Sequence, residues 1–264
     1  MTEDAPLIDT TVPHSARIWN YWLGGRDNYE VDRTAGEQYR EIFPDVLHVA
    51  RASREFLGRS IRYLIGEAGI TQFVDIGTGL PTVENTHQIA QRFAPQARIV
   101  YVDNDPLVIA HARALLTSGP RGATHYLHAD LREPERVLAA AADFLDLSRP
   151  VGLILCGVLG HVDGHRRARG IVRTLMDGLP SGSHLSANDG AYGRSPAFAE
   201  AQGHYNRSGA VPYHLRSREE IAAFFDGLDI VAPGIVPCPR WRPEPFREEP
   251  ADGLDLIGGV GRKP

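Results

Sequence analysis

The sequence predicts an α/β protein built on a mostly parallel sheet with helices on both faces. From Phe73 onward, short apolar runs alternate with helical patterns, and the first apolar run ends in a glycine-rich turn. These observations predict strands at 72–76, 98–102, 124–128, 151–156, 183–188, 229–235 and 254–259. The helices predicted between them span 82–93, 106–116, 134–145, 164–179 and 217–225, the last opening with a Ser217–Glu220 capping box.

Two further segments complete the predicted organisation. Before the first strand, apolar residues such as Phe56, Leu57 and Ile61 recur at helical spacing, so 49–68 is predicted to form an amphipathic helix against the sheet. The stretch 190–216 has no clear periodicity and is predicted to be an insertion at the carboxyl end of the sheet. The chain, 1–264, is therefore expected to form a single domain, with an N-terminal cap and helix in 1–70 and a Rossmann-like core in 71–264.

Composition narrows the function classes. The net charge of -5 lacks the basic excess that neutralises phosphates, so no nucleic-acid partner is expected. The two cysteines, Cys156 and Cys238, are far apart, which indicates neither a disulfide framework nor a metal site and fits a reducing compartment. The chain starts without a basic and apolar leader, and no apolar run approaches the ~20 residues that cross a bilayer. A cytoplasmic protein with no membrane partner is expected, either a monomer or a homodimer.

The first strand ends in the turn Asp75-Ile76-Gly77-Thr78-Gly79, where open α/β sheets bind their ligands. The two glycines remove side chains where a ligand would approach the backbone. A dinucleotide would require a third glycine, but Thr82 occupies that position, and Asp75 would repel a diphosphate. The ammonium and sulfonium of S-adenosylmethionine instead favour a carboxylate nearby. The turn therefore favours S-adenosylmethionine, with a nicotinamide-dependent oxidoreductase as the weaker alternative.

Acidic residues also follow the second and third strands. Asp103 is placed to accept hydrogen bonds from both ribose hydroxyls, and Asp130 from the adenine amino group. In the alternative interpretation these acids cap the following helices, as Asp105 is expected to do before Pro106. The predicted cofactor site also includes the neighbouring residues Thr78, Asn104, Ala129, Cys156 and Gly157.

The segment 14–29 combines aromatic side chains with arginines and glycines. Aromatic rings could stack on adenine or surround the sulfonium, and Arg17 could pair with the cofactor carboxylate. Tyr21, Gly24 and Gly25 are assigned to the cofactor site with Arg17, so the segment is predicted to be a helical lid. The alternative is a helix that buries its aromatic side chains against the core.

Several motifs carry a family resemblance that runs almost end to end. They are Pro13–Tyr21, Leu23–Tyr29, Asp75–Thr82, Tyr101–Pro106, Trp241–Pro243 and Gly259–Pro264. In these motifs the chain resembles the actinobacterial S-adenosyl methyltransferases long described as a domain of unknown function. The resemblance implies the class I methyltransferase fold, with a seven-stranded sheet whose last strand is antiparallel, and S-adenosylmethionine as ligand. It also implies that the cofactor pocket is lined by Asp75, Gly77, Gly79, Asp103 and Asp130.

The resemblance implies no methyl acceptor, and the chain departs from the family pattern near the expected acceptor site. Gly160 stands where a bulkier residue or a histidine is usual, and Asn188-Asp189 where Ser-His is usual. Methyl transfer is an in-line displacement that requires alignment and, for some acceptors, a base. His161 and Asp189 are the candidate bases, although His161 could instead cap or pack.

These observations predict an S-adenosylmethionine-dependent methyltransferase that acts on a small-molecule acceptor. Its insertion would shape the acceptor pocket or a dimer contact. The alternative from another class is a cofactor-binding regulator or a catalytically silent homologue.

Overall fold

The computed structural model describes residues 9–81, 84–115, 118–244 and 254–264. Its sheet has the strand order β3-β2-β1-β4-β5-β8-β6, with β7 paired to β8. Five strands are parallel to their neighbours: β1 (Gln72–Ile76), β2 (Arg98–Asp103), β3 (Ala123–His128), β4 (Gly152–Cys156) and β5 (His184–Gly190). The last strand, β8 (Leu256–Arg262), is antiparallel to β5. The α/β class and the antiparallel last strand are confirmed.

The prediction of a single strand over 229–235 is wrong. The segment contains only β6 (Asp229–Ile230), and β7 (Val236–Pro237) follows it, both paired with β8. Pro233 has no N–H to donate to a ladder, and Gly234 adopts a φ of 106°, so the chain turns between the two short strands. Within the described residues the sheet therefore has eight strands rather than seven.

Side chains alternate across the sheet and form a core on each face. On β1, Phe73 belongs to the core shared with α3 (Val46–Gly66) and α4 (Thr86–Phe93). Its neighbour Val74 belongs to the core shared with α6 (Pro134–Ala142) and α7 (His165–Asp177). Because both faces of the sheet are covered, the central strands read as continuous apolar runs, and this is why they could be located. The helix predicted at 49–68 is α3, which starts three residues earlier.

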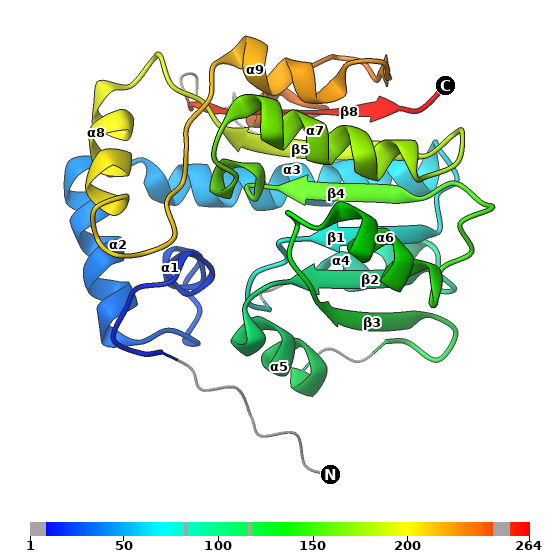
Figure 1. Ribbon diagram of the computed structural model, residues 1–264, viewed down its shortest axis with the longest axis horizontal. Helices are drawn as coiled ribbons and strands as arrows, with labels where there is room; N and C mark the ends of the chain where they lie inside the picture. Colours follow the sequence, from blue (N-terminus) through cyan, green and yellow to red (C-terminus); the bar gives the residue numbers. More distant parts are fainter. Residues whose placement is uncertain (1–8, 82–83, 116–117, 245–253) are drawn as a thin grey trace.

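Three helices lie beyond the carboxyl ends of the parallel strands, at the left in Figure 1. They are α1 (Ser15–Trp22), α2 (Glu30–Ile42) and α8 (Pro196–Tyr205), with α2 packed against both others. Aromatic rings join them: Trp22 contacts Tyr39 at 5.1 Å between centroids, and Tyr39 contacts Tyr205 at 6.5 Å. We call α1, α2 and α8 the cap. The burial of Trp22 matches the alternative interpretation of the N-terminal segment.

Helix α8 lies inside the predicted insertion, where no helix was predicted. Its start has two recognisable features: Ser195 Oγ accepts a hydrogen bond from Phe198 N at 3.2 Å, and Pro196 is the first helical residue. Its buried residues, Phe198, Ala201, Gln202 and Tyr205, recur at helical spacing, but a small and a polar residue among them leave only a weak apolar period. The capping feature was therefore the available sequence signal.

The remaining elements are short or lie at the edges of the sheet. Helix α5 (Pro106–Leu115) begins after Asp105, whose Oδ1 accepts from Leu107 N, so its predicted capping role is confirmed. The capping box of Ser217 and Glu220 is likewise confirmed at α9 (Arg218–Ala222). The 3-10 helices are η1 (Leu159–His161), η2 (Ala223–Phe225) and η3 (Cys238–Arg240). Among the described helices, none combines the length and apolar character that crossing a membrane requires.

Candidate functional site

The glycine-rich turn after β1 has a backbone that requires its glycines. Gly77 has a φ of 73°, and a Cβ there would lie 2.4 Å from Val158 Cγ2, so a side chain is excluded by conformation and by space. Gly79 has a φ of 64°, with nothing within 4 Å of a Cβ position. The open space beside Gly79 faces the cavity described below, where a ligand can approach the backbone.

Asp103 at the end of β2 holds this turn in place. Its Oδ2 accepts from Gly79 N at 3.1 Å, and its Oδ1 accepts from Asp105 N at 2.9 Å. Burial raises the pKa of Asp103 to about 6, although these two amides lower it. The carboxylate thus lies at the junction of the first two strands, where a ribose would be bound in a fold of this type.

Asp75, inside β1, is the second buried carboxylate of the site. Thr86 Oγ1 donates to its Oδ2 at 2.6 Å. Burial raises the pKa of Asp75 to about 6, against the opposing effects of Thr86 and of Arg54 on α3. A positively charged ligand would recover part of the cost of burying this carboxylate.

Asp130 after β3 has the opposite electrostatic character. Its oxygens accept from Arg132 Nε at 2.9 Å and from Arg132 Nη2 at 2.5 Å, and Asn104 Nδ2 lies 3.5 Å away. The Arg132 side-chain hydrogen bonds lower the pKa of Asp130 to about 2. Asp130 therefore stays ionised at neutral pH and retains lone pairs for another donor.

One cavity brings most of the predicted cofactor residues together. The predicted residues that line it are Asp75, Gly77, Thr78, Gly79, Asp103, Asn104, Ala129, Asp130, Cys156, Gly157 and His161. Sequence reasoning did not assign the lining residues His14, Trp19, Asn20, Ser53, Arg54, Leu131 and Val158 to the site. Three of these come from the segment 14–29, so the cap forms one wall of the cavity. Ser53 and Arg54 come from α3, whose helical period gave no indication of a ligand.

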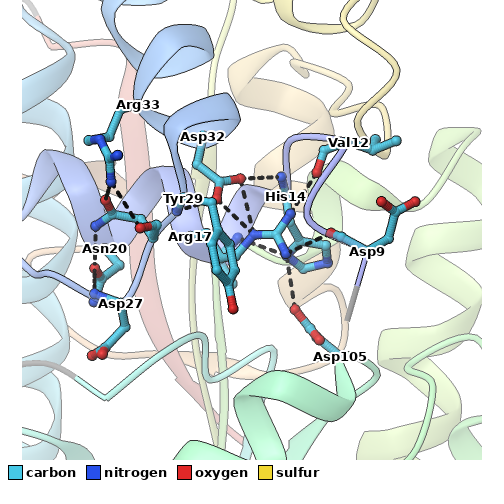
Figure 2. A network of polar contacts seen from close by, with 12 residues as sticks. Asp9, Val12, His14, Arg17, Asn20, Asp27, Tyr29, Asp32, Arg33 and Asp105 are labelled. Carbon is cyan, nitrogen blue, oxygen red and sulfur yellow. Dashed lines mark hydrogen bonds and ion pairs between the residues drawn. The ribbon is translucent and has the colours of Figure 1, made fainter. Parts of the chain in front are cut away.

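Arg17 does not line this cavity, contrary to its predicted pairing with the cofactor carboxylate. Figure 2 shows its guanidinium directed at Asp32 of α2 and at backbone carbonyls. Nε lies 2.9 Å from Asp32 Oδ2, and Nη1 and Nη2 donate to the carbonyls of Asp9 and Val12 at 3.1 and 2.6 Å. Both side chains are buried. Arg17 therefore holds α1 to α2 and to the segment before it.

We call the contacts of Arg17 with Asp32 the clasp. Asp32 also accepts hydrogen bonds from the backbone. It accepts from His14 N and from Tyr29 N, both at 2.9 Å, and so fixes the starts of α1 and α2. His14 Nδ1 in turn lies 3.2 Å from Asp105 Oδ2 at the start of α5 (Figure 2). Burial is the largest influence on the pKa of His14 and lowers it. This contact joins the cap to the core at the edge of the cavity.

The other three predicted residues of the N-terminal segment also lie outside the cavity lining. The Tyr21 hydroxyl donates to Glu37 on α2. Gly24 has a φ of 81° in the turn after α1. A Cβ on Gly25 would lie 2.3 Å from Asn20 Nδ2, so this glycine makes room for the Asn20 side chain. These residues shape the turn that presents Asn20, and we do not include them in the proposed binding site.

His161 lies in η1, just beyond β4, and lines the cavity on the other side of β1 from β2 and β3. Its Nδ1 is 3.0 Å from the carbonyl oxygen of Pro212, which only an N–H can satisfy. The proton is therefore assigned to Nδ1, and Nε2 carries a lone pair. Burial lowers the pKa of His161 to about 4, so the ring is neutral at physiological pH.

Asp189, the other candidate base, is buried behind this ring. Its carboxylate accepts from the Tyr213 hydroxyl and pairs with Arg216 Nη1 at 3.1 Å. Burial raises the pKa of Asp189 to about 6. The ring of Tyr213 meets that of His161 edge-on at 5.1 Å, and a Cβ on Gly160 would lie 2.2 Å from the Tyr213 ring. Asp189 does not line the cavity, and the unusual Gly160 makes room for Tyr213.

A second cavity lies under the cap and shares Ser15, Trp19, Gly157 and His161 with the first. Its other walls come from the cap helices, from α3 and from the ends of β5 and β8. The two cavities therefore meet at His161 and at the Gly157 backbone.

Comparison with known proteins identifies the family. A protein of the DUF574 family from Streptomyces avermitilis MA-4680 is 41% identical, with a TM-score of 0.91 over 98% of this chain and 100% of that one. A proposed methyltransferase from Thermobifida fusca YX is 36% identical, with a TM-score of 0.87 over 100% and 99%. The sequence pattern of the S-adenosyl methyltransferases matches residues 1–264. The chain belongs to the S-adenosyl methyltransferase family.

The cofactor of this S-adenosyl methyltransferase is S-adenosylmethionine, and the Rossmann-like methyltransferase fold is confirmed. The residues of the first cavity fit that cofactor, because open space faces Gly79 and the lining includes two buried carboxylates, which suit a ligand with positive charge and hydroxyl groups. The dinucleotide alternative is not supported; Thr82, which argued against it, lies outside the described residues.

The match to a curated protein is local. A trans-aconitate 2-methyltransferase from Deinococcus radiodurans is 39% identical over 71 residues. The match covers 27% of this methyltransferase and 26% of that protein, so the chain matches about a quarter of the curated relative's length. It identifies no acceptor for this chain.

Proposed function

We propose that this methyltransferase transfers the methyl group to a small-molecule acceptor held under the cap, with His161 as the base. One observation carries the proposal: the cavity that contains the glycine turn and the strand-end acids shares His161 with a second cavity. A cofactor in the first cavity and an acceptor in the second would meet at that residue. The walls of the second cavity are mostly apolar, which suits a small molecule rather than a polymer, and the net charge of -5 fits no nucleic acid.

The cofactor is assigned along the strand ends. Asp103 would accept from the ribose hydroxyls, and Asp130 from the adenine amino group. Asp75 lies beside the glycine turn, where its carboxylate would stabilise the ammonium and sulfonium of the methionine end. Arg54 lines the same cavity and interacts with Asp75, so we assign to it the pairing with the cofactor carboxylate that the sequence had suggested for Arg17.

The chain's own residues supply alignment and proton removal. S-adenosylmethionine supplies an activated methyl group when bound. The Gly157 backbone and Trp19 would limit where the acceptor lies relative to it, because both border the two cavities. His161 Nε2 would take the proton that the acceptor atom loses. Tyr213, held by Asp189, and the Pro212 carbonyl orient the ring for that step.

The compartment and the assembly state belong to the same proposal. Both cysteines are free, which supports a reducing, cytoplasmic compartment. The assembly state is a monomer or a homodimer, and either would leave the assignment of residues unchanged.

Variants of Asp103 and Arg54 test the orientation of the cofactor. Asp103→Ala is expected to weaken the binding of S-adenosylmethionine, S-adenosylhomocysteine and 5′-methylthioadenosine alike, by ~1 to 3 kcal/mol, because all three ligands contain the ribose. Arg54→Gln is expected to weaken only the first two, since 5′-methylthioadenosine lacks the amino-acid carboxylate. Calorimetric titration of each ligand measures both effects. Arg51→Gln, an exposed arginine on the same helix, is the matched control. Equal losses for all three ligands in Arg54→Gln would contradict its assignment.

A further inference from the structure

The second cavity is lined largely by aromatic side chains from the cap. Trp22 of α1, Tyr39 of α2, Phe198 and Tyr205 of α8, and Tyr213 all contribute to it. Their rings pack against one another and against Phe43, with Phe43 and Phe198 at 5.0 Å between centroids. Flat, rigid walls of this kind favour a planar ligand that can make edge-on or offset ring contacts.

The hydroxyl groups of the three tyrosines in these walls are already paired within the protein. The Tyr39 hydroxyl donates to Gln202 Oε1 at 3.1 Å, and Gln202 Nε2 donates to Asn206 Oδ1 at 3.0 Å. The Tyr205 hydroxyl donates to the Val211 carbonyl at 3.2 Å, and that of Tyr213 to Asp189. The Nε2 atom of His161 remains as an acceptor at the border with the first cavity. It is the natural partner for a single hydroxyl on the ligand.

The cavity also lacks a partner for a charged ligand. No Asp, Glu, Lys or Arg occurs among the described residues that line it. Asp189 lies behind Tyr213 and is paired with Arg216, and Asp32 is paired with Arg17 in the clasp. A carboxylate or ammonium on the ligand would lose its hydration here without a compensating charge.

We propose that the second cavity takes a small, neutral aromatic compound with a hydroxyl group, which is methylated on that oxygen. This inference rests on the proposed function and adds the class of acceptor to it. In the step, the oxygen forms a bond to the methyl carbon as the carbon–sulfur bond breaks, and the electron pair of that bond stays on sulfur. The hydroxyl proton moves to His161 Nε2 and then to water. The products are an aryl methyl ether, S-adenosylhomocysteine and a proton.

A ligand series with matched chemistry tests this acceptor class. Binding of 2-naphthol, 2-naphthoate and decahydro-2-naphthol is measured by calorimetry on the full chain saturated with S-adenosylhomocysteine. 2-Naphthol is expected to bind. 2-Naphthoate is expected to bind more than about tenfold more weakly, because its charge would be buried without a partner. Decahydro-2-naphthol is also expected to bind more weakly, because it lacks a planar ring. With S-adenosylmethionine, 2-naphthol is expected to yield 2-methoxynaphthalene, detected by mass spectrometry.

Phe198→Leu locates the binding to the cavity. Loss of the aromatic ring is expected to lower the affinity for 2-naphthol about three- to tenfold. The affinity for S-adenosylhomocysteine is expected to be retained, which would show that the variant is folded. Phe93→Leu, an exposed phenylalanine at the end of α4, is the matched control and is expected to bind 2-naphthol normally.

The outcomes separate this inference from the proposed function. If S-adenosylhomocysteine binds but 2-naphthol does not, or binds no better than 2-naphthoate, the acceptor class is wrong and the cofactor site stands. Equal 2-naphthol affinity in Phe198→Leu and Phe93→Leu would place the ligand elsewhere and overturn the inference. Failure to bind S-adenosylhomocysteine at all would overturn the proposed function itself.

Discussion

His161→Asn is expected to lower kcat about 10²- to 10⁴-fold while leaving the affinity for S-adenosylmethionine unchanged. Asparagine can still donate to the Pro212 carbonyl, but its side chain offers no nitrogen lone pair to take a proton from the acceptor. The rate of S-adenosylhomocysteine formation is measured with the best acceptor found in a panel of small phenols, amines and thiols. His214→Asn is the matched control, because this neighbouring histidine has an exposed side chain.

The pH dependence of the same reaction provides an independent readout. Burial lowers the pKa of His161 to about 4, so its base form predominates above about pH 5. Protonation of His161 is therefore not expected to reduce kcat between about pH 8 and pH 6. An acid limb near pH 6 to 7 in the wild type that disappears in His161→Asn would contradict this pKa. Full activity of His161→Asn with all acceptors would remove it as the base.

Arg17→Met is expected to lower the free energy of unfolding by about 3 to 5 kcal/mol, because it leaves the Asp32 carboxylate buried without its partner. Asp32 still accepts two backbone N–H groups, but these do not neutralise its charge. The cap is expected to loosen, which also weakens cofactor binding through the cavity wall that His14 and Trp19 form. Chemical denaturation monitored by tryptophan fluorescence measures the change in stability.

The surface pair between Arg40 and Glu37 supplies a control for this substitution. Both side chains are partly exposed and lie 2.7 Å apart, so Arg40→Met is expected to cost less than about 1 kcal/mol. The double variant Arg17→Met with Asp32→Asn is expected to recover part of the loss, because it removes the unpaired charge. Equal destabilisation by Arg17→Met and Arg40→Met would contradict the clasp.

Much of the sheet could be predicted because local sequence patterns show where its strands lie along the chain. Strands β1, β2 and β4 are short, largely apolar runs. The helices between the strands have a period or a capping residue that can be recognised in sequence. The segment after Asp229 was harder to predict. Its apolar residues suggested one strand, but Pro233 and Gly234 divide it, and only pairing with β8 decides which residues join the sheet.

The cofactor residues at strand ends could be predicted for a similar reason. Parallel strands bring their carboxyl ends to one edge, so Asp75 and Asp103 had to lie near each other. No such local rule shows which group a long cationic side chain will pair with. Arg17 was predicted to bind the cofactor because its partner, Asp32, belongs to another helix and could not be recognised in sequence. Arg54 lies on a helix that showed only a structural pattern, yet it lines the cavity.

The two candidate bases illustrate the same limit. His161 follows β4 and Asp189 lies near the end of the neighbouring strand β5, and the sequence could not distinguish them. Tertiary contacts do so, because Arg216 and Tyr213 occupy the carboxylate of Asp189, whereas His161 has one nitrogen held by Pro212 and the other available. Those contacts come from the chain after α8, which carried no periodic signal.

Calorimetric titration of the full chain with S-adenosylmethionine, S-adenosylhomocysteine and NAD tests the cofactor site most directly. Both adenosyl ligands are expected to bind and NAD is not. Their affinity is expected to fall as the pH decreases through about 6, because the carboxylate of Asp75, with a pKa of about 6, must be ionised to stabilise the ligand's cationic groups. Binding of NAD alone, or of none of the three, would contradict the site.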